Sequence, residues 1–243
     1  MRAFGFVFAR GGSKGLPGKN LLPLGGVPLV GRAVRSGLDS GVIERMFVST
    51  DDAAIAEAAR GHGAEVPFLR PEELAADDAP EWLAWRHAVD NVDDCDVFVS
   101  LPATSPLRTA DDVRACVAAY TRGGCDIVIT VRAAQRHPSF NMVTIGADGL
   151  ARLAMPPDAA ITRRQDAPKV FDMTTVAYVT SPGFIRRASG AFEGRVRDGH
   201  RGSRRVGVAA ASVVAGLRLR PRDRLREEVA VGLVVGGETG GIG

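Results

Sequence analysis

The sequence predicts an α/β protein whose core is a doubly wound, mainly parallel β-sheet. Short apolar runs typical of buried parallel strands alternate along the chain with segments that have a helical spacing of apolar residues. The first apolar run leads directly into a glycine-rich loop, at the end of a strand where open parallel sheets bind ligands. The chain has 243 residues, of which 45% are hydrophobic and 24% charged, which suits one globular domain with a small appendage.

Strands are expected where a short apolar run is bounded by turn residues. They are predicted at residues 4–8, 45–49, 65–69, 96–101, 126–131 and 175–180. The second of these runs ends at Thr50-Asp51-Asp52, and the fourth leads into Pro102 and the polar residues after it. The loop after the fourth strand is therefore expected at the edge of the sheet that binds ligands.

Helices are expected where apolar residues recur every three to four positions. They are predicted at residues 28–40, 53–60, 81–92, 111–120 and 182–189. Asp51 or Asp52 precedes the second helix, and capping of that helix is favoured over direct ligand binding. Trp82 and Trp85 on the third helix are interpreted as core packing rather than as a platform for base stacking.

Residues 133–175 have no helical period, and a small β excursion is predicted for them. Prolines interrupt this segment at positions 138, 156, 157 and 168. No internal repeat and no clear linker is visible in the chain.

The loop after the first strand has the chemistry of a phosphate site. Glycines at 11, 12, 15 and 18 and a proline at 17 exclude a helix and expose backbone N–H groups. Arg10, Lys14 and Lys19 add cations to those donors. Of the 31 lysines and arginines only three are lysine, and two of these lie in this loop. A basic but flexible surface loop is the alternative, and turn chemistry explains its glycines but not its lysines.

Two familiar phosphate loops are excluded. A Walker loop needs glycine four residues before Gly-Lys-Ser/Thr, but Asn20 follows Lys19 and Ser13 stands where that glycine should be. A dinucleotide loop needs Gly-x-Gly-x-x-Gly, which the glycine positions do not supply.

Residues 9–20 read Ala-Arg-Gly-Gly-Ser-Lys-Gly-Leu-Pro-Gly-Lys-Asn, and Pro-Leu-Gly-Gly-Val-Pro-Leu follows at 23–29. This stretch resembles, almost residue for residue, the opening of the N-acylneuraminate cytidylyltransferases, the CMP-sialic acid synthetase family of nucleotidyltransferases. Thr-Ser-Pro-Leu-Arg at 104–108 and Arg-Arg-Gln-Asp at 163–166 resemble two further signatures of that family. The resemblance covers about residues 3–197 and implies a Rossmann-like nucleotidyltransferase fold.

The resemblance implies transfer of CMP from CTP to a small acidic acceptor, with Mg²⁺ as cofactor and release of pyrophosphate. Arg10 and Lys19 are implied to be catalytic, holding the phosphates and stabilising charge on the leaving pyrophosphate. Residues implied to bind the nucleotide are Ala9, Gly11, Gly12, Ser13, Lys14, Asn20, Arg70, Asp78 and Ala79. Residues implied to bind the acceptor are Thr104, Ser105, Arg163, Arg164 and Gln165.

Several of these roles have structural alternatives. Asn20 would either fix the loop or touch the ribose. Thr104 and Ser105 suit capping of the next helix equally well, and solvated surface is the alternative for Arg163 and Arg164. In the family the region matching residues 133–175 forms the dimer, so a homodimer is expected.

The sequence departs from the family pattern on the acceptor side. Pro102, followed by Ala103, stands where the family has a glutamine, and Met173-Thr174-Thr175 replaces the family's Asn-Gly-Ala. The residues that the resemblance assigns to CTP are thus unchanged, whereas those on the acceptor side of the site differ from the family pattern. A sialic-acid-like 2-keto sugar acid is the first candidate acceptor, and a small phosphonate acid the alternative.

The family's closing Asp-x-Asp, which holds magnesium, is missing after residue 190, so the metal ligands are unknown. Residues 1–197 are therefore predicted to form the cytidylyltransferase domain, and residues 198–243 an atypical tail. One hypothesis for this tail is a reading-frame shift near Arg197. A catalytically inactive nucleotide-binding relative is the alternative of another class.

Composition argues against other partners. The net charge is +3, and the arginine-rich end of the chain has almost no aromatic residues, so no nucleic acid is expected as partner. No apolar run approaches the length of a membrane span, so no membrane is expected either. The three cysteines show no Cys-x-x-Cys spacing, which favours the reducing cytoplasm.

Overall fold

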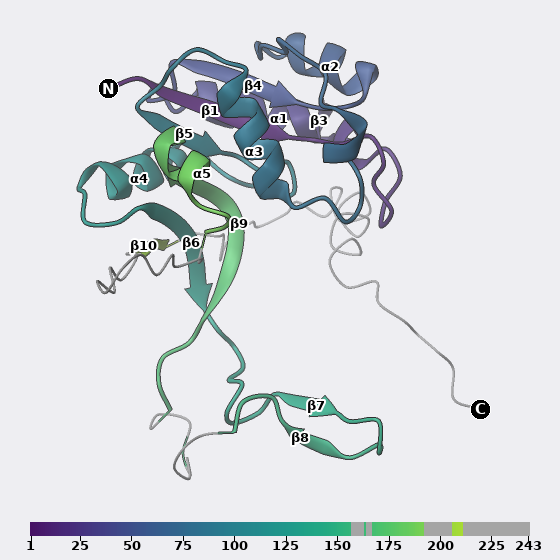
Figure 1. Cartoon of the computed structure of the whole chain (residues 1–243), viewed down its shortest axis with the longest axis vertical. Coiled ribbons are helices and arrows are strands. Elements are labelled where there is room, and N and C mark those ends of the chain that lie inside the picture. The colour runs from purple at the N-terminus through teal and green to yellow at the C-terminus, as the bar shows by residue number, and fades with distance from the viewer. Residues whose placement is uncertain (157–162, 164–166, 192–205, 211–243) are drawn as a thin grey trace.

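A computed structural model describes residues 1–156, 163, 167–191 and 206–210 of the chain. The fold has a central β-sheet with helices on both faces, and a hairpin arm projects away from this body (Figure 1). The strands are β1 (Ala3–Phe8), β2 (Pro23–Leu24), β3 (Val27–Pro28), β4 (Arg45–Ser49), β5 (Val97–Ser100), β6 (Ile127–Ala133), β7 (Val143–Ile145), β8 (Ala151–Leu153), β9 (Phe171–Thr180) and β10 (Val206–Ala210). The helices are α1 (Leu29–Leu38), α2 (Ala53–Arg60), α3 (Glu81–Asp90), α4 (Ala110–Thr121) and α5 (Pro182–Arg187), with 3₁₀ turns η1 (Lys19–Leu21) and η2 (Glu72–Leu74).

The central sheet has the strand order β10-β6-β9-β5-β1-β4. β1 pairs in parallel with β4 and β5, and β6 pairs in parallel with β10, whereas β9 is antiparallel to both of its neighbours. The predicted doubly wound, mainly parallel sheet is therefore confirmed. The strand order reverses at β1, since β4 lies on one side of it and β5 on the other, and such a switch point is where open sheets bind ligands.

Two apolar cores fill the two faces of the sheet. Val7 of β1 packs with α1, α2 and α4 on one face, whereas Phe4 and Phe6 pack with α3 and α5 on the other. Trp82 and Trp85 belong to this second core, which confirms their interpretation as packing residues. Successive β1 side chains alternate between the two cores because strand side chains alternate in direction.

Two local features fix the body around the site. Gly5 lies where an added Cβ would come within 2.1 Å of the Met46 sulfur, so a larger residue would require the Met46 side chain to move. Thr109 begins α4 with a capping box: its side chain accepts from the Asp112 N–H, and Asp112 accepts from the Thr109 N–H. The capping alternative for Thr104 and Ser105 is thus wrong.

One predicted strand does not form. Residues 65–69 make only an isolated bridge, between Glu65 and Phe47. Pro67 lacks the N–H that a longer ladder would need, so the pairing stops.

The β excursion predicted for residues 133–175 takes the form of an arm. β7 and β8 form an antiparallel hairpin at the far end of the long β6–β9 pair (Figure 1). β9 begins at Phe171, earlier than the predicted residue 175, because it pairs with β6 as far as Ala133. β10 pairs with β6 in the same sheet, so the sheet includes residues beyond 197, the end predicted for the catalytic domain.

Among the residues that the structure describes, no helix is both long and apolar enough to span a bilayer.

Candidate active site

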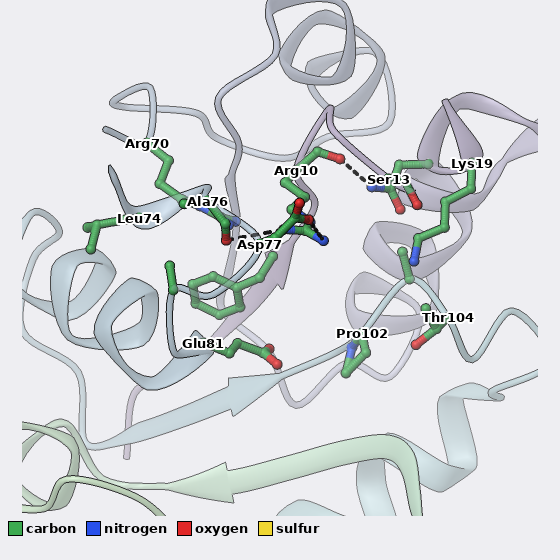
Figure 2. Close-up of a pocket in the computed structure, with 14 residues that line it drawn as sticks. Arg10, Ser13, Lys19, Arg70, Leu74, Ala76, Asp77, Glu81, Pro102 and Thr104 are labelled. Carbon is green, nitrogen blue, oxygen red and sulfur yellow. Dashed lines mark hydrogen bonds and ion pairs between the residues drawn. The ribbon is translucent and has the colours of Figure 1, made fainter. Parts of the chain in front are cut away.

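A pocket of about 280 Å³ opens at the carboxyl ends of β1 and β5 (Figure 2). It is lined by Phe8, Arg10, Ser13, Lys19, Asn20, Arg70, Leu74, Ala76, Asp77, Ala79, Glu81, Pro102, Ala103 and Thr104. Seven of the residues predicted for the site are among these: Arg10, Ser13, Lys19, Asn20, Arg70, Ala79 and Thr104. Segments far apart in the sequence thus meet where the strand order predicts a ligand.

The glycine-rich loop is held to the sheet by its own backbone. The Ala9 N–H donates to the Ser49 carbonyl at 3.1 Å, and the Gly11 N–H donates to an Asp51 carboxylate oxygen at 3.0 Å. A Cβ on Gly11 would lie 2.8 Å from an Asp52 oxygen, so the loop cannot pass here with a larger residue. Ala9, Gly11 and Gly12 do not line the pocket themselves and act as its support.

Asp51 and Asp52, which follow β4, have different roles. Asp52 caps α2, since its side chain accepts from the N–H groups of Ala54 and Ile55. Asp51 instead binds the glycine-rich loop through Gly11. The favoured capping interpretation is confirmed for Asp52.

The cations of the loop surround one carboxylate. Arg10 lies 2.7 Å from Asp77, and Lys14 forms an ion pair with the other oxygen of that carboxylate. Lys14 and Arg10 together hold the pKa of Asp77 below its usual range. Figure 2 shows Arg10 and Asp77 in the middle of the pocket, with Lys19 on one side of them and Arg70 on the other. The site therefore presents cations to an anion, and a protein carboxylate occupies two of them.

Asn20 fixes the loop. It is 4% exposed, and its side-chain amide donates to the Arg10 carbonyl at 3.0 Å. Because Asn20 also lines the pocket, contact with a ribose stays a prediction.

Arg70 lies at the inner end of the pocket. Its Nε and Nη2 both donate to Ser49, at 3.0 and 2.5 Å, and its guanidinium lies 5.7 Å from the centre of the Phe8 ring. Burial lowers the pKa of this guanidinium. Ala79 lines the same pocket, whereas Asp78 does not. An apolar ring beside a fixed donor suits a flat heterocycle with carbonyl oxygens.

The acceptor side gathers hydroxyl groups. Pro102, Ala103 and Thr104 line the pocket after β5. The Thr175 hydroxyl of β9 lies 3.0 Å from that of Ser105 and 3.4 Å from that of Thr104. The two departures from the family pattern, at Pro102 and at Thr175, thus flank one small region.

Of the remaining predicted acceptor residues, none that the structure describes lines the pocket. Arg163 is exposed and does not line the pocket, and Arg164 and Gln165 lie outside the described residues. Arg108, the last residue of the Thr-Ser-Pro-Leu-Arg run, is 8% exposed and donates to the Pro102 and Val176 carbonyls, so it supports the loop from behind.

Sequence reasoning missed four residues that line the pocket: Phe8, Leu74, Ala76 and Glu81. Asp77 immediately precedes Asp78 and Ala79, which were implied to bind the nucleotide, but its ion pairs with the loop cations span more than 60 residues. Glu81 has the sequence signal of an acidic residue in the first turn of a helix, which favours helix stability and does not indicate a ligand.

The residues present do not make a metal cage. In the part of the chain that the structure describes, no group of three or more His, Cys, Asp or Glu side chains is placed to hold a metal ion. Asp77 and Glu81 are the carboxylates that line the pocket, and Asp77 already binds two cations. The missing Asp-x-Asp is expected after residue 190, where the structure describes residue 191 and β10.

Comparison with known proteins shows which family the chain matches. The family model described as Cytidylyltransferase matches residues 4–172. A protein of Campylobacter coli named post-translational flagellin modification protein B is 29% identical over 191 residues, covering 76% of this chain and 80% of that protein. An N-acylneuraminate cytidylyltransferase of Streptococcus agalactiae is 28% identical over 197 residues, covering 80% of this chain and 47% of that protein.

A CMP-N,N'-diacetyllegionaminic acid synthase of Legionella pneumophila is 36% identical over 132 residues, covering 53% of this chain and 57% of that protein. The chain therefore spans about half the length of these last two relatives.

Solved structures share the fold. A CMP:2-keto-3-deoxy-manno-octonic acid synthetase complexed with CTP superposes with a TM-score of 0.59 at 19% identity, covering 76% of each chain. A 4-diphosphocytidyl-2C-methyl-D-erythritol synthase of Anaerococcus prevotii superposes with a TM-score of 0.60 at 9% identity, covering 95% of this chain and 98% of that one.

Proposed function

This chain belongs to the cytidylyltransferase family of CTP-dependent nucleotidyltransferases, and we propose that it transfers CMP from CTP to a sialic-acid-like 2-keto sugar acid and releases pyrophosphate. One observation carries the proposal. Arg10 and Lys19 of the glycine-rich loop line a single pocket together with Arg70 and Phe8. The first pair suits a triphosphate and the second a base.

In the proposed reaction an acceptor oxygen attacks the α-phosphorus of CTP. A new P–O bond forms as the bond to pyrophosphate breaks, so negative charge builds up on the leaving group. Arg10 and Lys19 stabilise that charge, and Lys14 assists from the loop. The N–H groups of Ala9, Gly11 and Ser13 donate within the protein, so the side-chain cations of the loop would hold the phosphates in line for the attack.

The names of two relatives support an acidic sugar as the acceptor, since they contain neuraminate and legionaminic acid. The resemblance assigns the carboxylate of such an acceptor to Arg163 or Arg164, by paired hydrogen bonds, although Arg163 does not line the pocket. Its attacking hydroxyl needs to lose a proton, and the hydroxyl groups of Thr104, Ser105 and Thr175 lie beside the pocket as its hydrogen-bond partners.

A second acceptor class is favoured by the loop after β5. Pro102 and Ala103 line the pocket where an amide side chain is expected for a sugar. A small phosphonate acid presents an oxygen that is already ionised and needs no base. It therefore remains the alternative acceptor.

Magnesium is part of the proposal only as an ion that arrives with the substrate. Mg²⁺ keeps several waters and binds through substrate phosphates more often than through a protein cage. No step is assigned to a protein-bound metal, since the described residues supply no three-ligand site.

A cytoplasmic location is proposed as well, because Cys95, Cys116 and Cys125 are free thiols.

A homodimer is proposed through the arm. Large apolar side chains are exposed there, among them Val143, Ile145 and Leu150 at 58%, 75% and 60%. An exposed apolar surface of this kind is typical of a protein–protein interface.

The test is pyrophosphate release with CTP and magnesium in the presence of 2-keto sugar acids and of small phosphonates. Release with a sugar acid supports the first acceptor, and release with a phosphonate alone supports the second. If CTP binds but no acceptor gives release, the chain is an inactive nucleotide-binding relative and the proposed activity is wrong.

A further inference from the structure

The pocket contains a carboxylate, Glu81, whose negative charge does not suit the phosphates of the proposed substrate. Of its two acidic residues, Asp77 is paired with Arg10 and Lys14. Glu81 forms no ion pair with any residue that the structure describes, yet it lines a pocket that is otherwise suited to a polyanion. An ionised carboxylate only accepts hydrogen bonds, so its partner in the ligand must be a donor.

Glu81 is hydrogen-bonded to Trp85, whose ring lies beside Phe8 of the pocket lining. It begins α3, and its carboxylate projects into the pocket toward Pro102 (Figure 2). Phe8 forms the wall here, with its ring centre 6.1 Å from that of Trp85 and 5.7 Å from the Arg70 guanidinium. Leu74 and Ala79 complete an apolar lining that suits the face of a base.

One oxygen of Glu81 is already fixed. The indole N–H of Trp85, one helical turn further on, donates to Oε1 at 3.1 Å. Trp85 is 4% exposed and packs in the core, so this hydrogen bond orients the carboxylate. The second oxygen, Oε2, remains the acceptor available to a ligand.

We propose that Glu81 binds the exocyclic amino group of cytosine and thereby makes this chain prefer CTP over UTP. The inference rests on the proposed function and adds to it the residue that selects the base. Cytosine carries an N4 amino donor where uracil carries an O4 acceptor. Arg70 offers only donors, and a donor that binds the O2 carbonyl common to both bases does not distinguish them.

Trp85 makes the substitution Glu81→Gln unusually informative. Its N–H continues to require an acceptor, so the glutamine amide is expected to turn its oxygen toward Trp85 and its NH₂ toward the pocket. The group facing the base then changes from an acceptor to a donor. Uracil O4 would accept from it, whereas cytosine N4 would face a second donor.

The experiment measures binding of CTP and of UTP by calorimetry, without acceptor, to the wild-type chain, E81Q and the control E73Q. Glu73 lies in η2, outside the pocket, and its substitution removes the same charge. We expect the ratio of CTP to UTP affinity to fall by about tenfold or more in E81Q, as hydrogen-bond selection predicts, and to stay unchanged in E73Q.

A second comparison uses E81A and the triphosphate of 2-pyrimidinone riboside, which is CTP without the amino group. The wild-type chain should bind this analogue more weakly than CTP by about tenfold, whereas E81A should bind the two alike. This pair of changes isolates the contact between Glu81 and the amino group from any general effect of the substitution.

Other results overturn the inference. An unchanged CTP to UTP ratio in E81Q, with normal thermal stability, shows that Glu81 does not select the base. A loss of turnover with unchanged nucleotide affinities places Glu81 at the reacting phosphate instead. If the wild-type chain binds neither CTP nor UTP, the proposed CTP-dependent function is itself wrong.

Discussion

In β1, five of six residues are buried, whereas every residue of β7 and β8 is exposed. The same chain thus contains a body that covers its own apolar side chains and an arm that does not. In the body, Phe4 and Phe6 are fully buried between the sheet and its helices. In the arm, Ile145 is 75% and Leu150 60% exposed.

The difference separates a part that covers its own apolar side chains from a part for which a partner is proposed. A two-stranded ribbon is marginally stable by itself, so the proposed dimer would stabilise the arm. The body instead has two apolar cores around one sheet. We therefore expect changes in the body to alter folding or chemistry, and changes in the arm to alter assembly.

The largest effect is expected from Lys19→Ala in the pocket. It removes a cation that would stabilise the leaving pyrophosphate, so turnover should fall by about 100-fold or more. The measurement is pyrophosphate release, with gel filtration and thermal unfolding alongside. An unchanged rate would exclude Lys19 from the reaction. A changed oligomeric state would contradict the expectation that substitutions in the body leave assembly unaffected.

Arg108 and Arg152 compare a buried arginine of the body with an exposed arginine of the arm. Arg108 donates to Ser36, Pro102 and Val176, so Arg108→Leu leaves buried acceptors unpaired and should lower the free energy of unfolding by about 3 kcal/mol. Arg152→Leu removes an exposed ion pair with Asp148 and an exposed hydrogen bond to the Leu150 carbonyl, and it should leave that free energy nearly unchanged. Urea unfolding of both variants tests the contrast, and similar losses would contradict it.

Ile145→Glu addresses the arm alone. A charge on this exposed apolar residue should raise the dissociation constant of the proposed homodimer by about 30-fold, as for a residue central to an interface. Analytical ultracentrifugation measures that constant. A chain that is monomeric before the substitution contradicts the proposed dimer, and a lower thermal stability of the monomeric body would show that arm and body are coupled.

The smallest effect is a pH dependence within the body. Burial, and then the nearby charge of Arg35, lowers the pKa of His62 from its ordinary value of 6.5. Below pH 6.5 the unfolded chain therefore binds a proton that the folded chain does not, so stability should fall as the pH drops from 7 toward 5.

His62→Gln should flatten this slope in thermal unfolding measured across the same range. Glu65 and Asp77 have lowered pKa values too, but they titrate at more acidic pH, so they do not obscure the effect. An identical slope in the variant would show that His62 does not contribute to it.

Most elements of the body could be predicted because their signals are local. The residues 45–49 and 53–60 were predicted as strand and helix with the same bounds as β4 and α2, since an apolar run and an alanine-rich helix with its aspartate cap lie within a few residues. The strand predicted at 65–69 was wrong because the ladder depends on a neighbour and is stopped by Pro67. β10 was not predicted, as its pairing with β6 is not local.

By itself the sequence determined the alternating strands and helices, the glycine-rich loop and the cations of that loop, because side-chain period and turn chemistry act over a few residues. Tertiary structure decided that Asp77 binds Arg10 and that Thr175 meets Ser105. It also left the side chains of the arm uncovered. These outcomes join residues far apart in the chain, and only packing of the whole sheet brings such residues within contact distance.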